Sequence, residues 1–155
     1  MIKDTAYEIQ LRKQRQKLHL LAAEAYKSVY GEDNGEFYGQ IAHHHEMGDE
    51  LETAKVYYLK AANFAENHYQ NELAIKYYKK TIEYEESKKE VFSCYNLIKS
   101  IMIMIGNWKE AKEYCNKCIS LASDLGESEL ARAWTGYGTF YFHKGDFEKS
   151  ENLFK

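Results

Sequence analysis

Apolar residues recur along the chain with the three-to-four-residue spacing of an α-helix. Between residues 18 and 29 this spacing is carried by Leu18, Leu21, Ala25 and Val29, which fall on one face of a helix. Later segments repeat the pattern, and none alternates apolar and polar residues with the period of two that a half-buried strand requires. The pattern predicts an all-α protein.

The turns between helices must be made without proline, because the chain contains none. Gly, Asn and Asp therefore have to end the helices. Helix starts are predicted at a Thr5/Glu8 capping box and at the caps Asp49, Ser128 and Asp146, and Gly31 is a candidate left-handed stop. We expect eight helices, at about residues 5–30, 36–47, 49–67, 72–86, 91–105, 108–124, 132–143 and from 146 onwards.

One motif indicates how these helices pair. Residues 134–141 read W-x-x-Y-G-x-x-Y, and Ser150 stands four residues before Phe154. This resembles the tetratricopeptide repeat, W-x-x-L-G-x-x-Y followed by A-x-x-x-F, with Tyr in place of Leu and Ser in place of Ala. The resemblance implies antiparallel helix pairs stacked into a right-handed α-solenoid, and a surface that binds other proteins.

The small residue of the second helix recurs earlier in the chain, at Ala54, Ala74 and Ala111. Ala54 and Ala74 are only 20 residues apart, too close for two full repeats. We therefore expect residues 53–67 to serve as the second helix of one pair and the first helix of the next. This gives an N-terminal helix in residues 1–33 that packs on the array, and about three to three and a half repeats in residues 34–155, the last of them truncated.

Composition narrows the function classes. A net charge of −3 and 45% hydrophobic residues describe an ordinary cytoplasmic protein, with neither a nucleic-acid surface nor a membrane span. The one basic run, residues 12–17, is interpreted as a solvated helix face. The N-terminus is charged and does not resemble a signal peptide.

Two motifs could carry chemistry, and both favour structural roles. His43, His44 and His45 are consecutive, so their side chains point about 100° apart on a helix and do not converge on one metal ion. Cys115 and Cys118 occupy packing positions of a second helix, where we expect buried, inert thiols. No Ser-His-Asp order, Gly-rich phosphate loop or zinc-protease motif occurs, so we expect no catalysis, no cofactor and no metal site.

The resemblance also implies which residues face the binding groove. In tetratricopeptide proteins these are the second, fifth, ninth, twelfth and thirteenth residues of each repeat, and they suit a peptide or an amphipathic helix with apolar anchors here. Trp134, Tyr137 and Tyr141 are assigned to packing instead. The groove positions are Glu36, Gly39, His43, Glu46 and Met47 in the first repeat; Ser93, Asn96, Ser100, Ile103 and Met104 in the next; and Arg132, Thr135, Thr139, Phe142 and His143 in the last.

The expected function is non-catalytic recognition of a protein or peptide. Residues 18–19, 41–49 and 54–62 also resemble the repeat region that follows the ATPase module in large bacterial signalling proteins, including adenylate and guanylate cyclase fusions. That resemblance implies a regulatory arm of a larger protein. Two alternatives stay open: a peptide-sensing regulator of the quorum type, and a self-association module that forms a homodimer through the truncated last helix.

Overall fold

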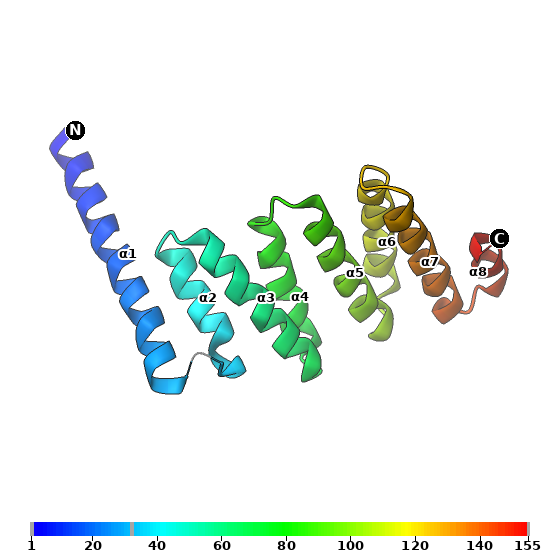
Figure 1. Ribbon diagram of the computed structural model, residues 1–155, viewed down its shortest axis with the longest axis horizontal. Helices are drawn as coiled ribbons and strands as arrows, with labels where there is room; N and C mark the ends of the chain where they lie inside the picture. The colour runs from blue at the N-terminus through cyan, green and yellow to red at the C-terminus, as the bar shows by residue number, and fades with distance from the viewer. Residues whose placement is uncertain (1, 32, 155) are drawn as a thin grey trace. The chain divides into compact units, whose positions relative to one another are not determined.

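The computed structural model describes the backbone of residues 2–31 and 33–154, and the side chains of residues 11–31 and 33–153. The described residues form helices and no strand, which confirms the all-α prediction (Figure 1). The elements are α1 (Ile2–Tyr30), η1 (Gly35–Phe37), α2 (Tyr38–Met47), α3 (Leu51–Asn67), α4 (Asn71–Glu83), α5 (Lys88–Met104), α6 (Trp108–Ala122), α7 (Glu127–Lys144) and α8 (Phe147–Phe154).

The chain divides into two compact units, residues 1–84 and residues 85–155, here called the N-terminal and the C-terminal unit. Within each unit every helix packs against the next one in the sequence, as expected of a helical repeat. The predicted division after residue 33 falls in the connection between α1 and η1. The right-handed winding of the whole array stays a prediction.

In the N-terminal unit, α3 packs against both α2 and α4. Its buried residues include Ala54 on one side and Ala61, Ala62 and Ala65 along its length, and Ala74 of α4 is fully buried as well. Side chains this small let the helix backbones approach closely. The predicted double role of residues 53–67 stays a prediction, because every interior helix of such a stack packs against two neighbours.

In the C-terminal unit, α5, α6 and α7 share a core, and α8 packs on α7. Phe92, Cys118, Ala122 and Ala133 form a buried cluster from these three helices. Ser150 of α8 is also buried, and its hydroxyl donates a 2.9 Å hydrogen bond to the carbonyl oxygen of Gly138 in α7. Ser150 therefore holds the helix-pair contact that the motif predicts.

Three predicted helix starts are wrong. Helix α1 begins at Ile2, so Thr5 lies within the helix and cannot cap it; the side chains of Thr5 and Glu8 lie outside the described residues. The cap of α3 is Glu50, because Asp49 adopts a left-handed φ of 69°. That conformation completes the turn after α2 instead of capping the next helix.

Helix α7 begins five residues before its predicted start, directly after Gly126. Gly126 has a φ of 126°, which lets the chain reverse at once, and Ser128 consequently lies inside the first turn and caps nothing. At α8 the prediction is confirmed, since Oδ1 of Asp146 accepts a hydrogen bond from the backbone N–H of Lys149.

The motif tryptophan is not a core residue. Trp134 is 39% exposed and stacks on Tyr137, whereas Phe140 in the same helix is fully buried. Ser150 fixes α8 at the level of Gly138, one turn of α7 away from Trp134. Trp134 therefore lies at the edge of the helix pair, and its assignment to packing needs correction.

Candidate functional site

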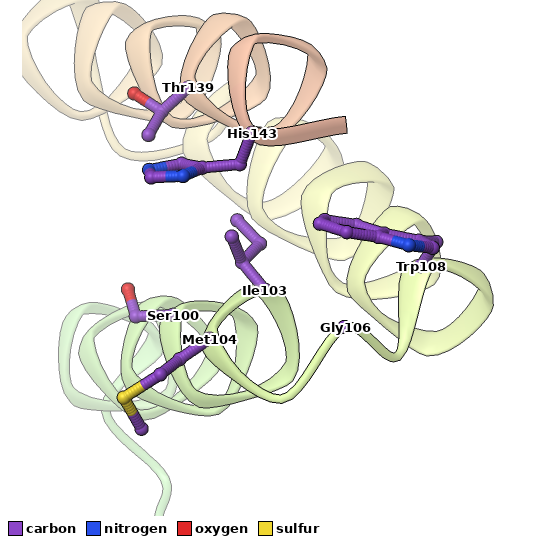
Figure 2. Close-up of a pocket in the computed structure, with 7 residues that line it drawn as sticks. All are labelled: Ser100, Ile103, Met104, Gly106, Trp108, Thr139 and His143. Carbon is purple, nitrogen blue, oxygen red and sulfur yellow. The ribbon is translucent and has the colours of Figure 1, made fainter. Parts of the chain in front are cut away.

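The C-terminal unit has a hollow of about 540 Å³ between α5 and α7. Five of its lining residues belong to the predicted groove set, so the repeat register brings residues from two helices to one surface. The turn after α5 and the first residue of α6 close one end. The lining residues are Ser100, Ile103, Met104, Gly106, Trp108, Thr139 and His143 (Figure 2).

The wall of this hollow, here called the apolar hollow, is mostly hydrocarbon. Figure 2 shows the His143 ring projecting from α7 toward Ile103, with Trp108 at the far side. The indole of Trp108 packs edge-to-face on the buried ring of Phe140, with ring centroids 6.2 Å apart. This contact fixes the orientation of a large aromatic surface that is partly open to solvent.

Trp108 is not among the groove positions predicted from the sequence, although it lines the apolar hollow. The sequence does contain a signal for this position, because the Gly106-Asn107 turn predicts a short connection. Only Ile105, Gly106 and Asn107 separate α5 from α6, so Trp108 returns close to the end of α5. Asn107 caps α6 by accepting a hydrogen bond from the backbone N–H of Glu110. Trp108 is thus held at the first position of a capped helix.

A second hollow of about 400 Å³ adjoins the first and shares Thr139 with it. It contains three further members of the predicted groove set from α5 and α7. We call it the cationic hollow, because Arg132 lines it and Lys99 lies against its wall. Its lining residues are Asn96, Ala131, Arg132, Thr135, Gly136 and Thr139.

Lys99 lies directly behind this second hollow, and its position was not predicted. Its side chain is only 5% exposed, and its Nζ donates a 2.6 Å hydrogen bond to Oδ1 of Asn96. A Cβ atom placed on Gly136 would lie 2.2 Å from that Nζ, so the absent side chain of Gly136 makes room for the ammonium group. In the register of the repeat Lys99 matches Gly138 of α7, a position where a long charged residue is unexpected.

Arg132 adds a second cation. Its guanidinium carbon lies 5.6 Å from the centroid of the Phe92 ring, a cation–π arrangement. None of the residues lining the two hollows is acidic, although the whole chain carries more Asp and Glu than Lys and Arg. The lining of the cationic hollow therefore carries a positive charge and no acidic side chain.

Phe142 lines neither of these hollows. Its ring lies 5.6 Å from that of Phe147 in α8, in an edge-to-face pair, and the two residues are 56% and 63% exposed. Ser93 also lies outside both hollows. The predicted groove of the C-terminal unit is therefore narrower than the register implies, with an exposed aromatic pair beside it.

In the N-terminal unit the carboxylate of Glu46 takes part in a network of hydrogen bonds between helices. Its carboxylate accepts hydrogen bonds from Tyr58, from Tyr84 at 2.5 Å and from Lys80 at 3.0 Å. Burial by itself would raise the pKa of Glu46, but the hydrogen bonds from Tyr58, Tyr84 and Lys80 outweigh it and lower the pKa to about 2. The carboxylate of Glu46 therefore already has hydrogen-bond partners within the protein.

The other predicted groove residues of this unit are dispersed. Met47 and one edge of Glu46 line a hollow of about 400 Å³ against α1, together with Arg12 and Arg15. Glu36 and Gly39 line a different hollow of about 240 Å³. The N-terminal unit therefore does not gather its predicted set on one surface.

The three consecutive histidines take different partners. The Nδ1 of His45, which is buried, lies 2.8 Å from a carboxylate oxygen of Glu50. The Nδ1 of His44 lies 3.0 Å from that of His19, and burial lowers the pKa of His44, with a smaller contribution from His19. His43 is exposed. Among the residues that the structure describes, no group of three or more His, Cys, Asp or Glu could hold a metal ion.

The thiols of Cys115 and Cys118 are free and buried, as expected. Burial raises the pKa of Cys115 to about 12 and that of Cys118 to about 11, and the nearby charge of Lys99 opposes part of this rise. Protonated thiols are poor nucleophiles and poor metal ligands.

Comparison with known proteins finds a tetratricopeptide repeat in one segment of the chain. A family model described as tetratricopeptide repeat matches residues 105–125, which comprise the turn after α5 and helix α6. The fold is similar to the crystal structure of BtubC (BKLC) from P. vanneervenii, with a TM-score of 0.52 and 17% sequence identity over 97% of this chain and 73% of that chain. No curated protein matches the sequence. None of the helices formed by the described residues combines the length and apolarity needed to cross a membrane.

Proposed function

We propose that the C-terminal unit recognises a peptide, or one helix of a partner protein, through the apolar hollow between α5 and α7. The tetratricopeptide repeat in residues 105–125 is a protein-interaction scaffold, in general a non-catalytic one. The observation that carries the proposal is the hollow of about 540 Å³, whose wall combines a fixed indole with aliphatic side chains. Aromatic residues held in such surroundings dominate the energy of many interfaces.

The chemistry of the lining supports a ligand with apolar anchors. Ile103, Met104 and Trp108 can cover one or two aliphatic or aromatic side chains. The hydroxyls of Ser100 and Thr139 donate to backbone carbonyl groups one turn earlier in their own helices. Their oxygen atoms still have lone pairs that can accept hydrogen bonds from the backbone N–H groups of a ligand.

The test uses Trp108 as its reporter. In a Trp134→Phe background Trp108 is the remaining tryptophan, since the chain has two. The protein is used to enrich binders from a randomised library of 12-residue peptides displayed on phage, and the best binder is then synthesised and titrated. We expect the emission of Trp108 to change and Met104→Ala to weaken binding about tenfold, the cost of losing one buried apolar contact.

A matched variant separates this site from the rest of the unit. Phe142→Ala removes an aromatic ring of similar exposure that lies outside the apolar hollow. If Met104→Ala leaves the affinity unchanged while Phe142→Ala lowers it, the binding surface is the aromatic pair on α7 and α8. An absence of any enriched peptide rejects the proposal.

Two finer functions extend this proposal. One is a regulatory arm of a larger signalling protein, and the other is a sensor of short peptides. If the unit is a sensor, the free peptide should bind about as tightly as the same sequence on a folded carrier. If the unit is a regulatory arm, the free peptide should bind much more weakly than the sequence presented on a folded helix. Comparing the affinity of the enriched peptide with that of the same sequence grafted on a folded helical carrier distinguishes them.

Self-association is the second candidate function, and the exposed Phe142–Phe147 pair favours it. Two adjacent aromatic rings on the surface form the kind of apolar patch that a second copy can cover. Sedimentation at increasing protein concentration measures the association. Phe147→Ser should shift the equilibrium toward the monomer, and an unchanged mass distribution excludes this surface.

A further inference from the structure

We propose that the cationic hollow binds an acidic side chain of the same ligand whose apolar side chain fills the apolar hollow. The proposal rests on the proposed function and adds a charge requirement to it. It concerns Lys99 and Arg132, neither of which donates a hydrogen bond to a carboxylate among the described residues.

The first argument is the burial of Lys99. Removing an ammonium group from water is costly unless a countercharge compensates it, and Lys99 is 5% exposed with the neutral amide of Asn96 as its hydrogen-bond partner. The amide of Asn96 is itself fixed, since its Nδ2 donates a 2.9 Å hydrogen bond to the carbonyl oxygen of Phe92. The ammonium group is therefore held at one place behind the wall of the hollow.

The second argument is the convergence of charge on this hollow. Arg132 and Asn96 line it, and Gly136, which Lys99 abuts, lies in the same wall. Arg132 is exposed, and its guanidinium packs over Phe92, which leaves the N–H groups at its edge available to a carboxylate. One cation in the lining, a second cation directly behind it and no acid among the lining residues are complementary to a ligand with one negative charge.

The third argument is distance. Thr135 lines the cationic hollow, Thr139 lines both, and His143 lines the apolar hollow. These residues are one helical turn apart along α7, or about 6 Å for each step of four residues. On a helical ligand, side chains three or four residues apart have nearly the same separation. The ligand we infer carries Asp or Glu three or four residues from a large apolar residue.

The peptide selection described above tests this inference when it is repeated with two variants. Arg132→Gln removes the exposed cation of the hollow, and Lys112→Gln removes another exposed cation, from α6, as a matched control. The wild type and Lys112→Gln should enrich peptides with an acidic residue three or four positions from an apolar one. Arg132→Gln should keep the apolar residue and lose the acidic one.

Synthesis of the best peptide with blocked ends then quantifies the charge. Replacing its acidic residue by the matching amide should weaken binding to the wild type about tenfold, the usual worth of a hydrogen bond to a charged group, and have little effect on Arg132→Gln. Apolar peptides without acid overturn the inference and leave the proposed function intact. A carboxylate that strengthens binding only at a free C-terminus also overturns the inference. If the selection enriches no peptide at all, both the inference and the proposed function are rejected.

Discussion

The hydroxyl of Tyr84 donates a 2.5 Å hydrogen bond to Oε1 of Glu46, although the two residues are 38 positions apart in the sequence. Tyr84 caps the end of α4, and Glu46 lies near the end of α2. Since Tyr58 of α3 donates to the same carboxylate, one charged group joins three helices of the N-terminal unit.

Glu46→Gln should destabilise the N-terminal unit by about 2 kcal/mol, because the amide cannot accept all three hydrogen bonds with the strength of a carboxylate. Urea denaturation followed by circular dichroism measures the change. Glu83→Gln is the matched control, since Glu83 also binds Lys80 but is exposed, and surface ion pairs contribute less than about 1 kcal/mol. Equal effects of the two substitutions would contradict the special role of Glu46.

The same carboxylate predicts how stability depends on pH. Its pKa in the folded protein is about 2, below the ordinary value of 4.5, so the unfolded chain binds the proton more readily. The contribution of Glu46 is therefore complete above its ordinary pKa and is lost as the pH falls from 4.5 toward 2. Melting temperatures of the wild type should fall more steeply over this range than those of Glu46→Gln, and parallel curves would reject the prediction.

Phe140 and Trp134 should differ sharply in their contribution to stability. Phe140→Ala empties a fully buried site and should cost about 3–5 kcal/mol. Trp134→Ala removes a ring that is 39% exposed and stacked on Tyr137, and should cost about 1–2 kcal/mol. Thermal unfolding of both variants shows which substitution costs more stability. A larger loss of stability for Trp134→Ala than for Phe140→Ala would mean that Trp134 is a core residue.

Lys99→Met should stabilise the C-terminal unit by about 1 kcal/mol in the absence of a ligand, because a buried charge is replaced by a side chain of similar length without charge. Denaturant unfolding measures the difference. If ligand binding requires Lys99, the same variant also loses the preference for acidic peptides. A clear loss of stability would mean that the bond to Asn96 outweighs the cost of burial.

Cys115 and Cys118 should react slowly with thiol reagents in the folded protein. At pH 8 their thiols are almost entirely protonated, since burial raises both pKa values to about 12 and 11. Labelling with iodoacetamide, followed by mass spectrometry, should be complete in denaturant and incomplete over the same time without it. Rapid labelling of the folded protein would revive a redox role for this pair.

Much of the fold followed from local rules. The period of apolar residues located the helices, and the small residues Ala54, Ala111 and Ser150 identified the helix contacts, because close approach of two backbones leaves room for few side chains. Helix starts were harder, as at Gly126, where the conformation of one residue moved the first turn ahead of the expected cap.

The site could be predicted only in part. Ser100, Ile103 and Thr139 followed from the repeat register, since one helix face always turns toward the groove. Lys99 could not, because its burial depends on the absence of a side chain at Gly136, a residue of another helix. The hydrogen-bond network of Glu46 could not be predicted for a similar reason: its partners come from α3 and α4, and only the tertiary structure brings them together.

In the N-terminal unit α2 and α3 each pack against two neighbouring helices, whereas the main helix contact of α1 is with α2. In an array held together by adjacent contacts, opening proceeds inward from the elements with a single neighbour. The backbone amides of α2 and α3 should consequently exchange with deuterium last in the N-terminal unit, and those of α1 first. The stacking of each helix on the next one in the sequence thus sets the order in which this part of the protein unfolds.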